Sequence, residues 1–127
     1  MTVPGGIRLS SVVLNSPDPI ALAGFYGRLL GWPLRDDPDP EWVMLDNPDG
    51  SVRLSFQRED IYEPPTWPAA PGRQQMMTHL DIHVDDLVAA CAHAADCGAT
   101  LDPHQPQEGV RVHRDPDGHV FCLFVDE

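Results

Sequence analysis

Residues 115–124 read DPDGHVFCLF, and residues 47–56 read NPDGSVRLSF. In both stretches a Pro-Asp-Gly sequence, typical of a tight turn, comes directly before a run with the apolar residues of a strand. The same motif occurs in both halves of a 127-residue chain, which indicates that the chain contains two copies of one supersecondary unit. This repeat decides the fold that we expect.

Two further matches keep nearly the same spacing. SVVLNSPD (11–18) aligns with HLDIHVDD (79–86), and LLGWPL (29–34) aligns with DCGATL (96–101) at a spacing one residue shorter. Matches in this order are difficult to attribute to chance. We therefore expect a single domain over residues 1–127, made of module 1 (about 5–58) and module 2 (about 77–127) with a Pro-rich linker over 58–77.

The sequence of each module predicts the same order of strands and helix. In module 1, a β-branched stretch over 8–15 predicts a strand, and helical spacing of apolar residues predicts a helix over 17–30 that stops at Gly31. Further strands are expected over 32–35, 41–46 and 52–57. Module 2 predicts a strand over 78–84, a helix over 86–97, and strands over 99–101, 109–114 and 119–125. The expected fold class is α+β, with two βαβββ modules in tandem.

Alternation along HLDIHV (79–84) separates two faces of a strand. The apolar set, Leu80, Ile82 and Val84, is expected to pack on the helices. The opposite face carries His79, Asp81 and His83. A solvated outer face would also carry polar groups. A plain exposed strand would carry Lys, Thr and Glu more often than two histidines, so we favour a functional site on this face.

The same reasoning assigns the other strands that face the site. The last strand presents Cys122 and Phe124, and the first strand presents Ser11, Val13 and Asn15. The strand over 52–57 is ambiguous, because strict repeat register puts Leu54 at the position of Cys122. Burial prefers Leu54 inward with Arg53, Ser55 and Gln57 on the site face, and we favour burial because one bulged residue reverses a strand.

The linker, REDIYEPPTWPAAPGRQQMM (58–77), contains four prolines and is not expected to form a regular element. It also carries Tyr62 and Trp67, which are costly to leave in water. Two interpretations stay open: the segment only joins the modules, or it also walls a ligand site.

Composition limits the partners. A formal charge of -12 argues against nucleic acid and anionic membranes, and it suits a cationic ligand or simply keeps the protein in solution.

The 3 cysteines are odd in number and unpatterned, which favours a reducing compartment. No apolar run approaches the roughly 18 residues of a membrane span, and the N-terminus lacks a signal-peptide core. We therefore expect a cytoplasmic location.

The stretches HLDIHVDDL (79–87), DPDGHVFCL (115–123) and YEPPTWP (62–68) resemble the vicinal oxygen chelate superfamily, the glyoxalase/bleomycin resistance/dioxygenase group, in its glyoxalase-like branch. The resemblance covers nearly the whole chain. It implies that the two modules form a curved mixed sheet, shaped as a cup that holds the ligand. It also implies a homodimer, since single-chain relatives with two modules usually dimerise.

In metal-dependent members, four strand positions hold a divalent metal, and they are typically His, Gln or Glu. Position by position these sites correspond to Ser11, Leu54, His79 and Cys122, and only His79 keeps a usual ligand type. The resemblance therefore implies no metal cofactor. A rebuilt zinc site of His79 and Cys122, with His83 or Asp81 as the third donor, stays as an alternative, as do Ni and Mn.

Two functions follow. The first is a metal-free protein that binds a small molecule, cationic or carbonyl-containing, through Val13, Asn15, Gln57, Tyr62, Trp67, Cys122 and Phe124. The second is a metal-dependent lyase, isomerase or epimerase that acts on a carbonyl-containing metabolite, with His79, Asp81 and His83 as general acid and base. Cys122 as a nucleophile is a weaker third hypothesis, because no basic neighbour is identified.

Overall fold

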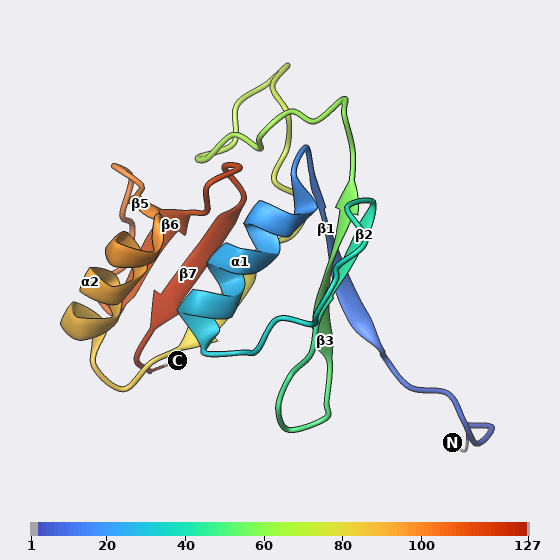
Figure 1. The fold of residues 1–127 in the computed structure, drawn as a ribbon. Helices are drawn as coiled ribbons and strands as arrows, with labels where there is room; N and C mark the ends of the chain where they lie inside the picture. Colours follow the sequence, from blue (N-terminus) through green and yellow to red (C-terminus); the bar gives the residue numbers. More distant parts are fainter. Residues whose placement is uncertain (1–2, 127) are drawn as a thin grey trace. The chain divides into compact units, whose positions relative to one another are not determined.

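The structure is a computed structural model that describes residues 3–126. The chain divides into two compact units, Met1–Glu59 and Asp60–Glu127. Each unit contains a sheet and a helix, and Figure 1 shows the elements in chain order. The expected α+β fold class is confirmed. No helix in residues 3–126 is long and apolar enough to cross a membrane.

The first unit is built from β1 (Ser11–Ser16), α1 (Pro19–Leu30), β2 (Trp42–Leu45) and β3 (Arg53–Arg58). The sheet has the order β1-β3-β2, in which β1 runs parallel to β3 and β2 runs antiparallel to it. The helix begins at Pro19, two residues after the predicted start, because the Asp18 side chain caps it by accepting a hydrogen bond from the Ala21 N–H at 3.2 Å.

The prediction of a strand over 32–35 is wrong. Within residues 3–59 this stretch makes only an isolated bridge between Leu34 and Leu45. Pro33 has no N–H to donate to a ladder. Beyond the bridge Asp37 has a φ of 48°, which turns the chain away from an extended path. The described part of the first sheet therefore has three strands rather than four.

Strand β3 has the register that burial of its apolar residues predicts, and not the register that the internal repeat predicts. Leu54 pairs with Val12, and Phe56 pairs with Leu14. Phe56 stacks on Tyr26 of α1 with ring centroids 5.8 Å apart, so Leu54 and Phe56 both lie on the helix side. The favoured prediction, with Leu54 turned inward, is therefore confirmed, and the alternative from strict repeat register is wrong. The reason is one extra residue between Gly50 and β3, relative to the residues between Gly118 and the last strand.

The second unit is built from β4 (Leu80–His83), α2 (Leu87–Cys97), β5 (Thr100–Leu101), β6 (Val110–Arg114) and β7 (Val120–Phe124). Its sheet has the order β4-β7-β6-β5, with β4 parallel to β7. Asp86 caps α2 by accepting a hydrogen bond from the Ala89 N–H at 3.1 Å. The order predicted for module 2 is confirmed.

The two faces of the second sheet differ in chemistry. On the helix side Phe121 and Leu123 are fully buried, and His113 stacks on Phe121 with ring centroids 5.3 Å apart. Burial lowers the pKa of His113, which makes it a neutral core residue. On the opposite face Asp81 pairs with Cys122, and Cys122 pairs in turn with Val112. This open face is the one that the sequence assigned to the site.

The Pro-rich segment packs on the second unit. The Thr66 N–H donates to the Gln74 carbonyl at 2.8 Å, and Thr66 also forms a bridge with Gln75. Pro64 lies against the turn before β7, where a Cβ added to Gly118 would come within 2.8 Å of the Pro64 Cβ. The first residues of the segment are thus held against the DPDG turn.

The turns over residues 47–50 and 115–118 supply a matched test of this contact. Gly118 and Gly50 have φ values of 91° and 78°, and each N–H closes its turn at 2.9 Å. We expect Gly50→Ala to cost about 1–2 kcal/mol from backbone strain alone, because nothing lies near its added methyl group. Gly118→Ala adds a collision with Pro64 and is expected to cost on the order of 1 kcal/mol more. Thermal unfolding measures the loss of stability in each variant. Equal losses in the two variants would contradict the contact between Pro64 and the turn at Gly118.

Candidate ligand and metal site in the second unit

A cavity of about 690 Å³ lies on the open face of the second sheet. Its volume falls in the range that suits a small organic ligand. Its lining comes from the Pro-rich segment, the residue before β4, β4 itself, the loop before β6, strands β6 and β7, and the chain after β7. The lining residues are Trp67, His79, Asp81, Pro106, Gln107, Gly109, Val110, Val112, Cys122, Phe124 and Asp126.

The floor of the cavity is apolar. Val112 and Cys122 are neighbours on adjacent strands and form a buried cluster with Val120. Trp67 packs against this cluster, and its indole Nε1 donates to the His104 carbonyl at 3.3 Å. The Trp67 ring therefore has a defined place above the sheet. Of the two interpretations of the Pro-rich segment, the structure supports the one in which it walls a cavity.

The polar end of the cavity is formed by His79, Asp81 and Cys122. His79 Nε2 and Asp81 Oδ1 are 3.1 Å apart, and these side chains are 37% and 51% exposed. Asp81 lies beside Cys122 in the parallel β4–β7 pairing. One ligand atom from each of the three side chains lies within 4.8 Å of the others. Alternation places the first two side chains on one face, and strand pairing brings the third to them.

The Cys122 thiol is held in its neutral form. Burial raises its pKa to about 11, and the negative charge and hydrogen bond of Asp81 act in the same direction. A thiol with a raised pKa is a poor nucleophile near neutral pH. The arrangement therefore gives no support to Cys122 as an activated nucleophile.

The charge of the cavity is negative. Asp81 and Asp126 are both in the lining, and no Arg or Lys accompanies them. Sequence reasoning missed Asp126, Gln107 and the loop residues next to it. Alternation along β6 could have found Val110 and Val112. Nothing in the sequence indicates that the loop before β6 or the residue after Val125 reaches the same cavity.

His83 does not line the cavity. Its Nε2 lies 2.8 Å from the Val125 carbonyl, and its ring makes an edge contact with Phe124 at 5.3 Å. The hydrogen bond requires the proton on Nε2. His83 shares the face of Asp81, as expected, but its side chain is engaged with the end of β7.

Tyr62 also lies outside the lining. Its ring is 5.1 Å from that of His119, and within residues 3–126 its buried hydroxyl has no hydrogen-bond partner. Burial raises the pKa of Tyr62, and the charges of Asp115 and Asp117 raise it further. Its role is to pack the Pro-rich segment on the turn before β7.

The remaining predicted residues belong to the first unit. Val13 pairs with Ser55, and Asn15 pairs with Gln57, all on the face of the first sheet opposite α1. Ser11 shares this face, and Leu54 does not. The structure therefore brings together five of the predicted residues in the second unit: Trp67, His79, Asp81, Cys122 and Phe124.

The usual four-position metal site does not fit these residue types. Ser11 offers only a hydroxyl, and Leu54 offers no ligand atom and faces the helix. Ser55, which takes the open face instead, again offers only a hydroxyl. His79 and Cys122 are the two positions with good ligand atoms, so any metal would depend on a third donor outside the usual set.

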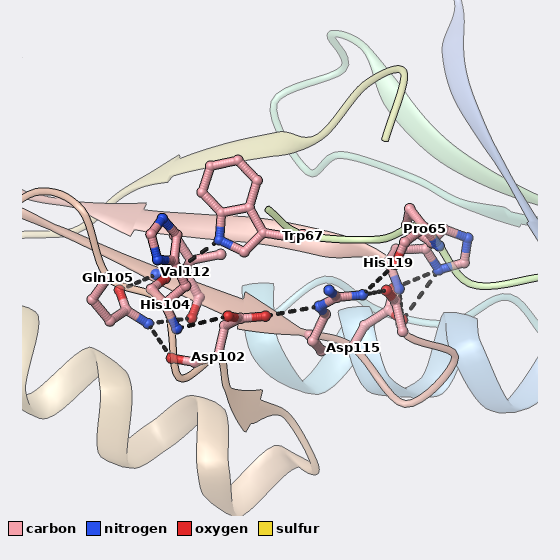
Figure 2. A network of polar contacts seen from close by, with 10 residues as sticks. Pro65, Trp67, Asp102, His104, Gln105, Val112, Asp115 and His119 are labelled. Atoms are coloured by element: carbon pink, nitrogen blue, oxygen red, sulfur yellow. Dashed lines mark hydrogen bonds and ion pairs between the residues drawn. The ribbon is translucent and has the colours of Figure 1, made fainter. Parts of the chain in front are cut away.

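A buried network supports the cavity wall (Figure 2). Arg114 donates to the Asp102 carboxylate at 3.1 Å and to the Pro65 and Gly118 carbonyls at 2.7 and 2.9 Å. Asp102 is 5% exposed and also accepts the His104 N–H at 2.9 Å. One guanidinium thus ties together the segment before Trp67, the turn before β7 and the loop after β5.

Gln105 fixes the rest of that loop. Its side-chain Nε2 donates to the Asp102 and Val112 carbonyls at 2.7 and 2.8 Å, and its Oε1 accepts the Val112 N–H at 2.8 Å. This amide extends the hydrogen bonding of β6 into the loop. The next two residues, Pro106 and Gln107, are thereby placed at the cavity.

Comparison with known proteins agrees with this fold. A family model described as a glyoxalase-like domain matches residues 11–124. A glyoxalase/bleomycin resistance protein/dioxygenase family enzyme from Burkholderia phytofirmans PsJN is 22% identical, with a TM-score of 0.68 over 92% of this chain and 97% of that chain. TnmS3, an antibiotic binding protein from Streptomyces sp. CB03234, is 20% identical, with a TM-score of 0.63 over 98% of this chain and 100% of that chain.

The oxidase ChaP-H2 is 18% identical, with a TM-score of 0.66 over 96% of this chain and 95% of that chain. At these identities the solved structures establish the fold and not a reaction. Comparison with curated protein sequences gave no match. The fold is that of the glyoxalase/bleomycin resistance/dioxygenase proteins, in the vicinal oxygen chelate superfamily. Within it, the chain belongs to the family of glyoxalase-like domains.

The Arg114 network gives a test of how Trp67 is held. Arg114→Lys keeps the positive charge but loses the fork that reaches Asp102, Pro65 and Gly118 together, so we expect a loss of about 1–3 kcal/mol in the free energy of unfolding. With Trp32→Phe and Trp42→Phe also present, Trp67 is the one tryptophan left in the sequence. In that background, Arg114→Lys should move the Trp67 emission maximum to longer wavelength, toward that of an exposed indole.

Arg58→Lys is the matched control. Arg58 Nη1 lies 3.9 Å from Glu41 Oε1 in the first unit, and these side chains are 41% and 68% exposed. Exposed pairs contribute little, so stability and Trp67 emission should stay close to those of the unmodified protein. An Arg114→Lys variant with unchanged Trp67 emission would show that the network does not place the indole.

Proposed function

We propose that the chain binds a small organic cation in the cavity of its second unit. The observation that carries this proposal is the lining, which combines apolar walls with the carboxylates of Asp81 and Asp126 and contains no Arg or Lys. A cation in such a cavity gains Coulomb energy from both carboxylates, whereas an anion is repelled by them. The net charge of -12 on the whole chain acts in the same direction.

The aromatic rings of the cavity favour the same ligand class. Trp67 and Phe124 both line it, and Trp67 is held by its bond to the His104 carbonyl. The face of an indole attracts a cation by about 0.5–2 kcal/mol, depending on how much water is excluded. The name of the similar structure TnmS3, an antibiotic binding protein, supports ligand binding as a use of this fold.

A second candidate function is favoured by one specific observation. The ligand atoms of His79, Asp81 and Cys122 converge within 4.8 Å, as a metal site requires. If these residues hold a metal, the second hypothesis from the sequence applies, which is a lyase, isomerase or epimerase of a carbonyl-containing metabolite. We rank it below simple binding, because three of the four usual metal positions hold Ser11, Leu54 and Cys122 instead of His, Gln or Glu.

We also infer that the chain forms a homodimer, in a cytoplasmic setting. Strands β1 and β4 each end their own sheet in the described residues, and each leaves one edge without a partner strand in that sheet. Light scattering should give twice the 14.0 kDa mass of the chain. A mass equal to that of a single chain would contradict this inference.

The binding proposal is tested with pairs of aryl-alkyl amines and their alcohol counterparts, in the presence of a chelator. Calorimetric titration should show that the amine binds more tightly than the alcohol. Asp126→Asn should weaken amine binding roughly tenfold, since one charge pair at a partly exposed site contributes on the order of 1–2 kcal/mol. Trp67→Leu should weaken binding of both compounds.

The control is Asp96→Asn, which removes the same charge from an exposed position on α2, away from the cavity lining. This variant should bind the amine as the unmodified protein does. Equal affinity for amine and alcohol, or equal effects of Asp126→Asn and Asp96→Asn, would contradict a cation site in this cavity.

A further inference from the structure

Three different kinds of ligand atom meet at the polar end of the cavity. His79 contributes a ring nitrogen, Asp81 contributes a carboxylate oxygen and Cys122 contributes a sulfur, all within 4.8 Å of one another. All three belong to the second unit, and all three line the cavity. They are brought together by alternation on β4 and by the pairing of Asp81 with Cys122 across β4 and β7.

We propose that His79, Asp81 and Cys122 form a binding site for one Zn²⁺ ion. Zn²⁺ takes imidazole, thiolate and carboxylate ligands in one shell, and three protein ligands leave one position open. The proposal rests on the ligand atoms of this one unit. It supplies the metal site that the second candidate function requires, and it does not require the organic cation.

The geometry needs only a small adjustment. Ligand atoms around a tetrahedral Zn²⁺ lie roughly 3.3–3.8 Å apart, given bond lengths of about 2.0–2.3 Å. His79 Nε2 and Asp81 Oδ1 are already 3.1 Å apart, and the full set spans no more than 4.8 Å. His79 and Asp81 are partly exposed, so their side chains can rotate toward the more buried Cys122 without a change in the sheet.

The sulfur ligand decides which metal fits. A thiolate is a soft ligand that favours zinc, whereas Mg²⁺ and Mn²⁺ prefer sets made of oxygen. The site also differs from the four-position arrangement described above. It uses Asp81, which is not one of those positions, and it needs nothing from Ser11, Leu54 or Ser55.

Binding changes the protonation of one group. The S–H bond of Cys122 breaks, an S–Zn bond forms, and the proton goes to solvent. Asp81 exchanges its contact with His79 for the metal. We therefore expect one proton released for each ion bound, with no oxidation or reduction of the protein.

The test uses the full chain without a histidine tag. The protein is dialysed against Zn²⁺ and then against metal-free buffer, and its metal content is measured by mass spectrometry. One equivalent of Zn²⁺ is expected, with no retention of Mn²⁺ or Mg²⁺ under the same treatment. Replacement by Co²⁺ should add the charge-transfer absorption of a cobalt–thiolate bond, which reports sulfur ligation without any activity assay.

The variants separate this trio from other sets. Cys122→Ser should abolish the cobalt–thiolate absorption, and Asp81→Asn should weaken Zn²⁺ binding more than about tenfold, since even outer partners of metal ligands contribute about 10–100-fold. Asp81 is exposed, so its variant is expected to fold even if a variant of the buried Cys122 does not.

Two controls complete the design. Cys91→Ser removes a thiol on α2 that is outside the trio, and His83→Gln removes a histidine on the same strand face whose Nε2 is bonded to the Val125 carbonyl. Both should keep one equivalent of Zn²⁺ and the cobalt spectrum. Less than stoichiometric Zn²⁺ in the unmodified protein, or full retention in Asp81→Asn, would overturn the site. If His83→Gln loses the metal and Asp81→Asn retains it, the assignment of Asp81 as a zinc ligand is also overturned.

Discussion

The ion pair between the partly buried Arg114 and the buried Asp102 is the contact on which the cavity depends. A guanidinium that also binds the Pro65 and Gly118 carbonyls joins three segments that are remote in sequence, and no neutral side chain has enough donors to replace it. Burial of a charged carboxylate is unfavourable unless it is paired, so Asp102 in turn requires Arg114. Over the described residues 59–77 the Pro-rich segment contains no helix or strand, and the Arg114 hydrogen bond to the Pro65 carbonyl helps to hold it as the wall that carries Trp67.

The strands and helices could be predicted because their signals are local. Asp18 and Asp86 mark helix starts, and alternation in HLDIHV identified the open face of β4 correctly. Repeat register failed at Leu54, because alternation has a period of two and one additional residue after Gly50 reverses every side chain of β3. Burial predicted the right register from the sequence, since Leu54 and Phe56 have to reach the helix. The short strand over 32–35 failed for a different reason, in that Pro33 cannot support a ladder.

Five of the eleven lining residues lie on strands and were accessible to the same reasoning. Asp81, Cys122 and Phe124 follow from alternation and from pairing of the first and last strands of the unit. Asp126 and Gln107 did not follow, because their positions depend on how Gln105 and the chain after Val125 are held. His83 shows the complementary limit. Alternation places it on the right face, but only the structure shows that its ring is bonded to the Val125 carbonyl rather than directed to the cavity.

The proposed cation and the proposed zinc ion draw on the same carboxylate. Without metal, Asp81 is charged and the Cys122 thiol is neutral, since burial raises its pKa to about 11. With Zn²⁺, the charges of the ion, Asp81 and a thiolate cancel, so the trio becomes neutral and only Asp126 is left to attract a cation. Each ligand must then weaken the other by the same factor, because linkage between two sites is reciprocal. The metal-free protein is therefore the form suited to an organic cation, and the zinc form is suited to a neutral, oxygen-bearing ligand such as a carbonyl compound.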